Sequence, residues 1–350
     1  MQSFFVIAIL VLGFVVMFQI AKASEYVGIL RGEEKSRKQS NRVNAFLLLV
    51  FLILGLIGVY YCNEQLKDKI LGPSASDHGI LVDRMLYITL ALTGVVFFAT
   101  QIALFWFSFK YQESDKRKAF YYPHNNKLEL IWTVIPAITL TILVGFGIFY
   151  WFKITGDAPK NAMVVEVTGK QFGWEFRYPG NDGVLGKKYY KNIDAAKNNP
   201  VGQIWDDEAN KDDIFVEQEM HVVVNKPVKL VIGAKDVIHD VGLAHFRMKM
   251  DAVPGTPTTM WFTPLYTTKQ MQDKYGKDFA YEISCDQMCG KGHWSMRGVI
   301  VVDTQEEFDA WIAGKKPQYY VAFPDKDPSA PKADSLAKPA PVVASLTTDK

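Results

Sequence analysis

The sequence predicts a membrane-anchored α plus all-β protein, with N-terminal transmembrane helices followed by a β-sandwich outside the cytoplasm. Three features predict this class. The apolar residues of the 350-residue chain are concentrated in four long runs within its first 152 positions. Short β-rich runs alternate with turn residues from about residue 163. Basic residues are concentrated in two of the three loops between the apolar runs. This distribution predicts how the chain is oriented in a membrane. The formal net charge of +2 gives no reason to expect a nucleic-acid partner.

Two apolar runs lie within residues 1–82, which we assign to two additional N-terminal transmembrane helices and their connecting loops. Residues 3–21 are apolar almost without interruption, close to the ~20 residues that a helix needs to cross a bilayer. Ala21-Lys22-Ala23 resembles a signal-peptide cleavage site, but the start of the chain lacks a positive charge, so a retained helix is favoured. The second run, residues 45–61, is 17 residues long and lies at the short end of the spanning range.

The next two apolar runs predict a transmembrane hairpin over residues 83–155. They extend from about residue 85 to 109 and from about 130 to 152, and neither contains a charged residue. With the first two runs they make four spans, an even number that puts both ends of the chain on the same side.

The basic residues of the loops indicate which side that is. The loop 22–44 holds six basic residues and the loop 110–127 holds five, whereas the loop 62–82 holds two. Because loops rich in Lys and Arg stay in the cytoplasm, the chain beyond residue 152 is expected outside. Cleavage of the first run would leave this orientation unchanged.

Residues 156–314 are predicted to form the β-sandwich, with a polar insertion at about residues 180–215. A short helix is expected after Thr304, because Glu307 three residues later completes a capping box. Residues 315–350 are rich in Pro and Ala and hold few large apolar groups, so a disordered or surface-bound tail is expected. The candidate strands are residues 163–167, 172–178, 221–224, 228–232, 259–262, 279–284 and 298–302.

The stretch from Cys285 to Met296 is the part of the chain whose residue types and spacing predict chemistry. Two thiols four positions apart, an imidazole four further on and a thioether three beyond that are donors suited to copper. A mononuclear blue-copper site needs only one Cys, so the second thiol makes two metal ions bridged by two thiolates possible. The alternative is a short-range disulfide between Cys285 and Cys289, which the nearby His293 and Met296 disfavour.

A closed metal site needs a donor from elsewhere in the fold, and His239 can supply it. This histidine follows the predicted strand 228–232 and lies 46 residues before Cys285. Such a histidine and a loop of Cys, Cys, His and Met at one end of a β-sandwich form the cupredoxin arrangement. Gly290 and Gly292 would let the loop turn tightly enough for its donors to converge.

These residues resemble subunit II of the haem-copper cytochrome c oxidases. The resemblance is carried by the Cys285 to Met296 loop, by Asp236-Val237-x-His239 and by Met250-Asp251-Ala252-Val253-Pro254-Gly255. It extends over about residues 83–303. It implies a cupredoxin-like domain on the periplasmic side of a bacterial inner membrane. It also implies a dinuclear copper centre, Cu-A, that accepts electrons from cytochrome c and passes them to haem in subunit I.

The resemblance also implies a role for each donor. Cys285 and Cys289 would bridge the metals, His239 and His293 would be terminal ligands, and Met296 and the main-chain carbonyl of Gln287 would be weak ligands. The family usually has Glu at position 287, where its side chain also reaches a magnesium ion shared with subunit I. A neutral amide is a poorer partner for a hard cation, so the residue at position 287 disfavours the magnesium site.

Three further residues take roles from the resemblance. Phe172 stands where the family usually has the tryptophan that first accepts electrons, and Trp174, two residues on, is expected on the same face of a strand. This pair could share the role, or Trp174 could be buried packing. Glu129 would lie at the mouth of a proton pathway into subunit I, or would simply be a carboxylate at a helix start. His245 and Met248 are not expected to be ligands.

The predicted function is the electron-input subunit of a proton-pumping terminal oxidase, within a complex with haem-bearing subunit I and other subunits. The four apolar runs contain no histidine, so oxygen reduction would occur in a partner. No Cys-x-x-Cys-His is present, so the donor would be a separate cytochrome c or haem c domain. Two alternatives remain at this point: the Cu-A subunit of a nitric oxide reductase, and a metal-free subunit of quinol-oxidase type.

Overall fold

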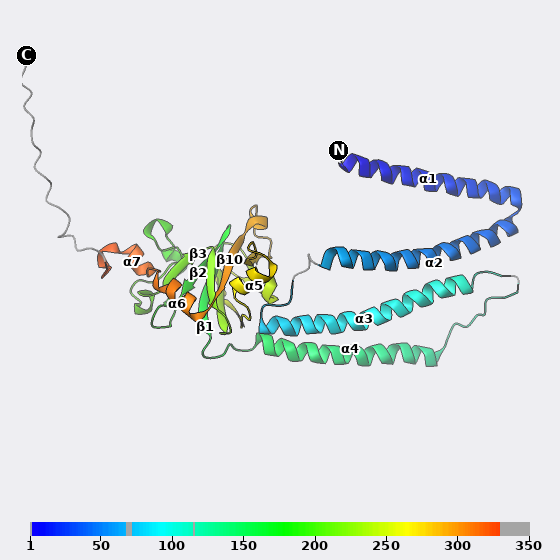
Figure 1. The fold of residues 1–350 in the computed structure, drawn as a ribbon. Coiled ribbons are helices and arrows are strands. Elements are labelled where there is room, and N and C mark those ends of the chain that lie inside the picture. Colours follow the sequence, from blue (N-terminus) through cyan, green and yellow to red (C-terminus); the bar gives the residue numbers. More distant parts are fainter. Residues whose placement is uncertain (1, 68–71, 115, 330–350) are drawn as a thin grey trace, which may run out of the picture. The chain divides into compact units, whose positions relative to one another are not determined.

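The protein divides into helices of membrane-spanning length and a β-sandwich in a computed structural model, which describes residues 2–67, 72–114 and 116–329 (Figure 1). Two compact units result, namely residues 1–70 with 84–147, and residues 71–83 with 148–350. The predicted class of apolar helices followed by a sandwich is therefore confirmed.

Within the described residues, four helices are long and apolar enough to cross a membrane, as the four apolar runs predict. Each is longer than its apolar run, because polar residues extend the helix at its ends. Pro136 lies inside the last of them. These helices are α1 (Gln2–Arg31), α2 (Glu33–Leu66), α3 (Asp77–Lys110) and α4 (Asn126–Thr155).

Within the first unit, α2 lies beside α3. Phe51 of α2 and Phe105 of α3 contact each other with ring centroids 6.0 Å apart. Ala45 and Phe105 are the two buried apolar residues of these helices. Arg37 reaches Glu113 with a nitrogen–oxygen distance of 3.0 Å. The additional helices therefore contact the predicted hairpin through α2.

The second unit contains two five-stranded sheets. One has the order β3-β2-β1-β5-β8 and the other the order β4-β10-β9-β6-β7. Most neighbouring strands are antiparallel, but β1 pairs in parallel with β5, and β10 with β4. The strands are β1 (Met163–Lys170), β2 (Gly173–Tyr178), β3 (Ile214–Glu217), β4 (Glu219–Val223), β5 (Val228–Ala234), β6 (His239–Leu243), β7 (Met248–Ala252), β8 (Thr258–Phe262), β9 (Tyr281–Cys285) and β10 (Arg297–Asp303).

The core lies between the inner faces of the two sheets. Val165 and Val167 of β1 alternate toward it, as do Leu230 and Ile232 of β5, and all four are at most 1% exposed. Trp174 of β2 fills the same core and is fully buried. Burial of such side chains contributes about 1.5–3 kcal/mol each and drives the sheets together.

Three strands of the structure were not predicted from the sequence. They are β3 and β6, whose sequences Ile-Phe-Val-Glu and His-Asp-Val-Gly-Leu do not alternate clearly between polar and apolar residues, and β7, whose sequence Met-Lys-Met-Asp-Ala does alternate and could have been predicted. Pairing with neighbours decides their conformation: β6 lies between β7 and β9 in the second sheet. Strand propensity is weak when such contacts compete with it.

Two short helices pack against the sandwich. α5 (Thr268–Tyr275) and α6 (Gln305–Ala313) both begin at capping boxes, formed by Thr267 with Gln270 and by Thr304 with Glu307. The second is the one that the sequence predicts. On α6, Trp311 stacks on His221 of β4 with ring centroids 4.0 Å apart. His221 is thus a buried packing residue.

The polar insertion between β2 and β3 is folded and contains 3₁₀ turns rather than long strands. Its anchor is Arg177 of β2, which is 2% exposed. The Arg177 guanidinium contacts the carboxylates of Glu166 and Asp213 at 2.7 Å each. It also donates to the Gly186 carbonyl and to Asn210 Oδ1, at 2.8 and 3.0 Å. The insertion ends where β3 begins, at Ile214.

The first part of the predicted tail, residues 315–329, is bound to the surface of the insertion, which is the second of the two alternatives expected for it. Residues up to 329 are described, and α7 (Gln318–Ala322) packs on the insertion. Trp205 of the insertion lies edge-on to Tyr319 and Phe323, with centroids 5.9 and 5.8 Å away. These aromatic contacts supply the burial that the composition after residue 315 does not suggest. Residues 330–350 lie outside the described part of the chain.

Candidate metal centre

Three connections at one end of the sandwich build the candidate metal centre. They are the β1–β2 turn around Gln171 and Phe172, the β5–β6 connection that ends in His239, and the β9–β10 loop from Cys285 to Met296. The β6–β9 pairing aligns Val241 with Cys285, which brings His239 near the thiols. His239 follows β5 after a short connection and is the first residue of β6.

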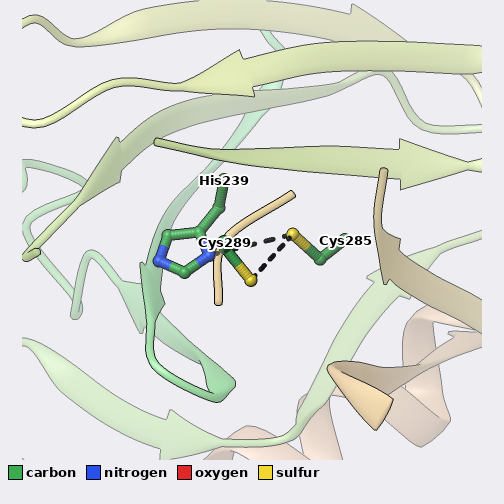
Figure 2. A group of neighbouring side chains, drawn as sticks. All are labelled: His239, Cys285 and Cys289. Carbon is green, nitrogen blue, oxygen red and sulfur yellow. Dashed lines mark hydrogen bonds between the residues drawn. The ribbon is translucent and has the colours of Figure 1, made fainter. Parts of the chain in front are cut away.

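The two thiols and the first imidazole lie together in the interior. Figure 2 shows His239, Cys285 and Cys289 pointing toward one another. The two Sγ atoms are 3.7 Å apart, and His239 Nδ1 is 3.8 Å from Cys285 Sγ. The disulfide alternative does not apply, because an S–S bond is ~2.05 Å long and both cysteines are free. His239, Cys285 and Cys289 are all buried.

The remaining predicted donors extend this cluster. His293 Nδ1 is 3.7 Å and Met296 Sδ 3.8 Å from Cys289 Sγ. The Gln287 carbonyl oxygen is 3.1 Å from Cys285 Sγ. One sulfur therefore has His239 and the Gln287 carbonyl near it, and the other has His293 and Met296.

Asp236 orients His239 for metal binding. His239 Nε2 is 2.8 Å from Asp236 Oδ1. A ring nitrogen that donates its proton to a carboxylate leaves the other nitrogen as an acceptor, and here that nitrogen is Nδ1, which faces the thiols. Burial would raise the pKa of Asp236, but hydrogen bonds from His239 and from two backbone N–H groups outweigh it and lower the pKa. The carboxylate is thus ionised at neutral pH.

The neighbourhood of the thiols shapes how a metal ion would bind. Burial first, and then the adjacent Cys285, raise the pKa of Cys289 to about 11. A metal ion that binds here therefore displaces a proton. Gly169 of β1 makes room for the His239 ring, since a Cβ at this position would lie 2.9 Å from His239 Cδ2.

The donor chemistry and spacing fit copper. Thiolates, imidazoles and a thioether are the ligands that copper and other soft or borderline ions prefer, and hard ions avoid them. Two ligands about 2.2 Å from one shared ion at a tetrahedral angle stand about 3.6 Å apart. The sulfur–sulfur and sulfur–nitrogen distances of 3.7–3.8 Å match this separation.

Phe172 and Trp174 do not share a strand face, which corrects the sequence-based expectation. Phe172 lies in the turn between β1 and β2 and is 41% exposed, whereas Trp174 is on β2 and fully buried. The Phe172 ring covers the Cys loop, because a Cβ on Gly292 would lie 2.6 Å from its ring atoms. Trp174 faces the interior with its ring centroid 6.2 Å from that of His239.

Other residues that the sequence singled out lie apart from the donor cluster. Glu129 is in the first turn of α4, where its carboxylate approaches the Asn125 backbone N–H at 3.5 Å. His245 packs edge-on against Phe279 and Tyr281, with centroids 5.1 and 5.6 Å away. Gln287 is exposed, and it contacts the donor cluster through its main-chain carbonyl, which lies near Cys285 Sγ.

Sequence reasoning missed two residues that support the ligands. Asp236 could have been found, because an acidic residue three positions before a ligand histidine is well placed to bind its second nitrogen. Gln171 gave no such indication. Its contact with the Cys loop depends on the β1–β2 turn and on a residue 118 positions away.

Comparisons with known proteins agree with this arrangement. Residues 65–150 match the family description "Cytochrome C oxidase subunit II, transmembrane domain", and residues 163–304 match "Cytochrome C oxidase subunit II, periplasmic domain". The alternative cytochrome c oxidase subunit 2 of Bradyrhizobium diazoefficiens is 32% identical over 70% of this chain and 83% of its own length. Cytochrome c oxidase subunit 2 of Thermostichus vulcanus is 25% identical over 69% and 77%.

Among solved structures, the periplasmic domain of subunit II of cytochrome oxidase from Bradyrhizobium japonicum is 23% identical. It covers 47% of this chain and 99% of its own, with a TM-score of 0.33. The two family matches together run through the transmembrane hairpin and the sandwich that carries the donor cluster. The chain belongs to the cytochrome c oxidase subunit II family.

Proposed function

We propose that this chain is the electron-input subunit of a terminal oxidase and that its donor cluster holds a dinuclear copper centre. When bound, the copper pair would accept single electrons from cytochrome c and pass them to haem in subunit I. There oxygen would be reduced to water with proton pumping. The observation that carries the proposal is the second buried thiol, 3.7 Å from the first, with a histidine beside each.

The ligands are held by rigid elements, which suits electron transfer. His239 and Cys285 lie on the paired strands β6 and β9, so their separation is fixed by the sheet. Cys289 and Met296 are at most 4% exposed and are packed in the core. Residues that cannot move when the charge of the site changes keep the reorganisation small. Two sulfur atoms shared between two ions would also spread that charge.

The face that a soluble donor would approach is the outer side of the Cys loop. Phe172 covers the glycines of this loop and is itself exposed. Trp174 is buried behind it, so we assign the first contact with the donor to Phe172 and a packing role to Trp174. Glu129, in the first turn of α4, remains a candidate for the proton-pathway role.

A metal-free role is hard to reconcile with the site. Five soft or borderline donors converge there, and two of them are buried thiols. If the role of this set were only structural, apolar residues would serve it better. The magnesium site is not part of the proposal, because position 287 has a neutral amide. A partner that reduces nitric oxide instead of oxygen would need the same electron-input site, so this chain alone does not favour that alternative.

Copper stoichiometry tests the proposal. The full chain in detergent is expected to bind two copper ions per molecule, and the Cys285→Ser and Cys289→Ser variants to bind fewer than two. Reduced cytochrome c should then reduce the loaded wild-type protein but neither variant. One copper per wild-type chain, or equal binding by all three proteins, would rule out the dinuclear site.

A further inference from the structure

We propose that Gln171 is a positioning residue that fastens the two halves of the copper site to each other. The inference rests on the proposed function, because it concerns the same site. One half is the β5–β6 connection with Asp236 and His239. The other is the loop from Cys285 to Met296. Gln171, in the turn between β1 and β2, is bonded to both.

The first bond runs through the backbone. The Gln171 N–H donates to Asp236 Oδ2 at 2.7 Å, while the other carboxylate oxygen, Oδ1, lies 2.8 Å from His239 Nε2. The Val237 N–H also donates to Oδ1, at 2.7 Å. Asp236 is therefore held from two directions, and its position sets the direction in which His239 Nδ1 points.

The second bond runs through the side chain. Gln171 Nε2 donates to the main-chain carbonyl of Cys289 at 2.6 Å. The next residue, Gly290, has a φ of 129°. A Cβ on Gly290 would lie 2.8 Å from Gln171 Nε2, and one on Gly292 would meet the Phe172 ring. Only glycines at these positions let the turn lie directly on the Cys loop.

The consequence is that the part of the loop that carries Cys289 and the first imidazole move together. Cys289 is attached to Gln171, Gln171 to Asp236, and Asp236 to His239, so a shift of the loop would break at least one charge-assisted or short hydrogen bond. Gln171 is exposed and contributes no core packing. Its substitution should loosen the site while leaving the stability of the sandwich unchanged.

Two substitutions separate the hydrogen bond from the shape of the side chain. Gln171→Leu keeps the size but removes the donor, and Gln171→Glu keeps the shape but turns a donor into an acceptor. The matched control is Gln318→Leu. Gln318 Nε2 also donates to a main-chain carbonyl at 2.6 Å, that of Asn198, in the contact between α7 and the insertion.

The first readout needs no copper. Hydrogen exchange of the full chain in detergent is measured on the segment 285–297, where the His293 and Met296 N–H groups donate to loop carbonyls. Loss of one hydrogen bond should speed exchange about three- to tenfold in both Gln171 variants. The control should exchange like wild type. Unchanged exchange in Gln171→Leu would overturn the proposal.

The second readout is copper retention against a chelator. Loss of a group that supports a metal ligand typically lowers metal affinity 10–100-fold, and we expect this range for both Gln171 variants. The copper resonance spectrum should broaden as the ligand geometry becomes less uniform. Retention and spectra equal to wild type would contradict a positioning role.

The experiments distinguish a failure of the proposed function from a failure of the role of Gln171. If the wild-type chain binds no copper pair, the proposed function is wrong, yet the exchange comparison still tests whether Gln171 holds the two loops together. If wild type binds two copper ions and the Gln171 variants match it in exchange and retention, the function stands and the role of Gln171 falls.

Discussion

At the scale of residues, the donor cluster depends on groups that bind no metal themselves. Asp236 fixes which nitrogen of His239 faces the thiols. Gly169 and Gly290 provide space where a side chain would collide with His239 or with Gln171. Each of these requirements is local, so single substitutions can test them.

Gly290→Ala tests the close approach of the turn to the Cys loop. We expect a loss of about 1–3 kcal/mol in the free energy of unfolding, because a φ of 129° is strained for alanine. The added Cβ would also displace Gln171, so copper retention should fall. Gly276→Ala is the control, since Gly276 has a φ of 106° but no atom within 4 Å of the added Cβ. Retention should fall only in the first variant; an equal effect in both would show that strain alone matters.

His245, which packs against Phe279 and Tyr281, should make stability depend on pH. Burial lowers its pKa below the usual 6.5, so the folded protein holds fewer protons at this site than the unfolded chain. The contribution of His245 to stability is therefore complete above about pH 6.5 and is lost as the pH falls below it. His245→Phe should show a smaller loss of stability between pH 7 and 5, measured by thermal unfolding of the full chain. An equal or larger loss would contradict this reading.

At the scale of elements, the insertion between β2 and β3 is attached to the sandwich by buried charge. Arg177 is surrounded by Glu166, Asp213, Gly186 and Asn210. A buried ion pair adds little stability compared with apolar packing, but removing one partner leaves a charge without compensation. The network therefore specifies where the insertion folds back.

Arg177→Met tests this attachment. Loss of the guanidinium leaves Asp213 fully buried and should lower the free energy of unfolding by about 3–5 kcal/mol in chemical denaturation. Arg297→Met is the matched control. Its ion pair with Glu282 spans 3.3 Å between side chains that are 64% and 47% exposed, so its loss should be about 0–1 kcal/mol. Similar losses in the two variants would argue against a special role for Arg177.

The sequence predicted elements best where a single local rule decides them. The four apolar runs and the capping box at Thr304 depend only on nearby residues, and the structure contains all of them. β6 was missed because sheet pairing, not local pattern, makes it a strand, whereas the alternating residues of β7 could have been found. The metal donors could be named from their chemistry and spacing, whereas Gln171 could not, because its role arises from contacts between distant segments. The aromatic contacts of α7 were missed for the same reason.

At the scale of the whole molecule, the sandwich is a periplasmic domain of a membrane protein. The family match includes a transmembrane domain over residues 65–150 and a periplasmic domain over 163–304. The distribution of basic residues places the loops 22–44 and 110–127 on the inner side. The outer ends of α2 and α4 should then lie on the side of the donor protein.

Cys62 offers a direct test of this orientation, because it is exposed near the end of α2 and the other two cysteines are buried. A thiol reagent that does not cross membranes should label Cys62 when added to the outside of spheroplasts. In a Cys62→Ser background, Ser40→Cys, in the first part of α2 that is expected on the inner side, should be labelled only after permeabilisation. Labelling of Ser40→Cys in intact spheroplasts would reverse the assigned orientation.

The central claim is that the two thiols of one loop hold two copper ions as a single centre. Electron paramagnetic resonance of the copper-loaded full chain tests it most directly. We predict one unpaired electron coupled to two equivalent copper nuclei, and loss of this pattern in Cys289→Ser. A wild-type spectrum with coupling to one copper nucleus would contradict the claim.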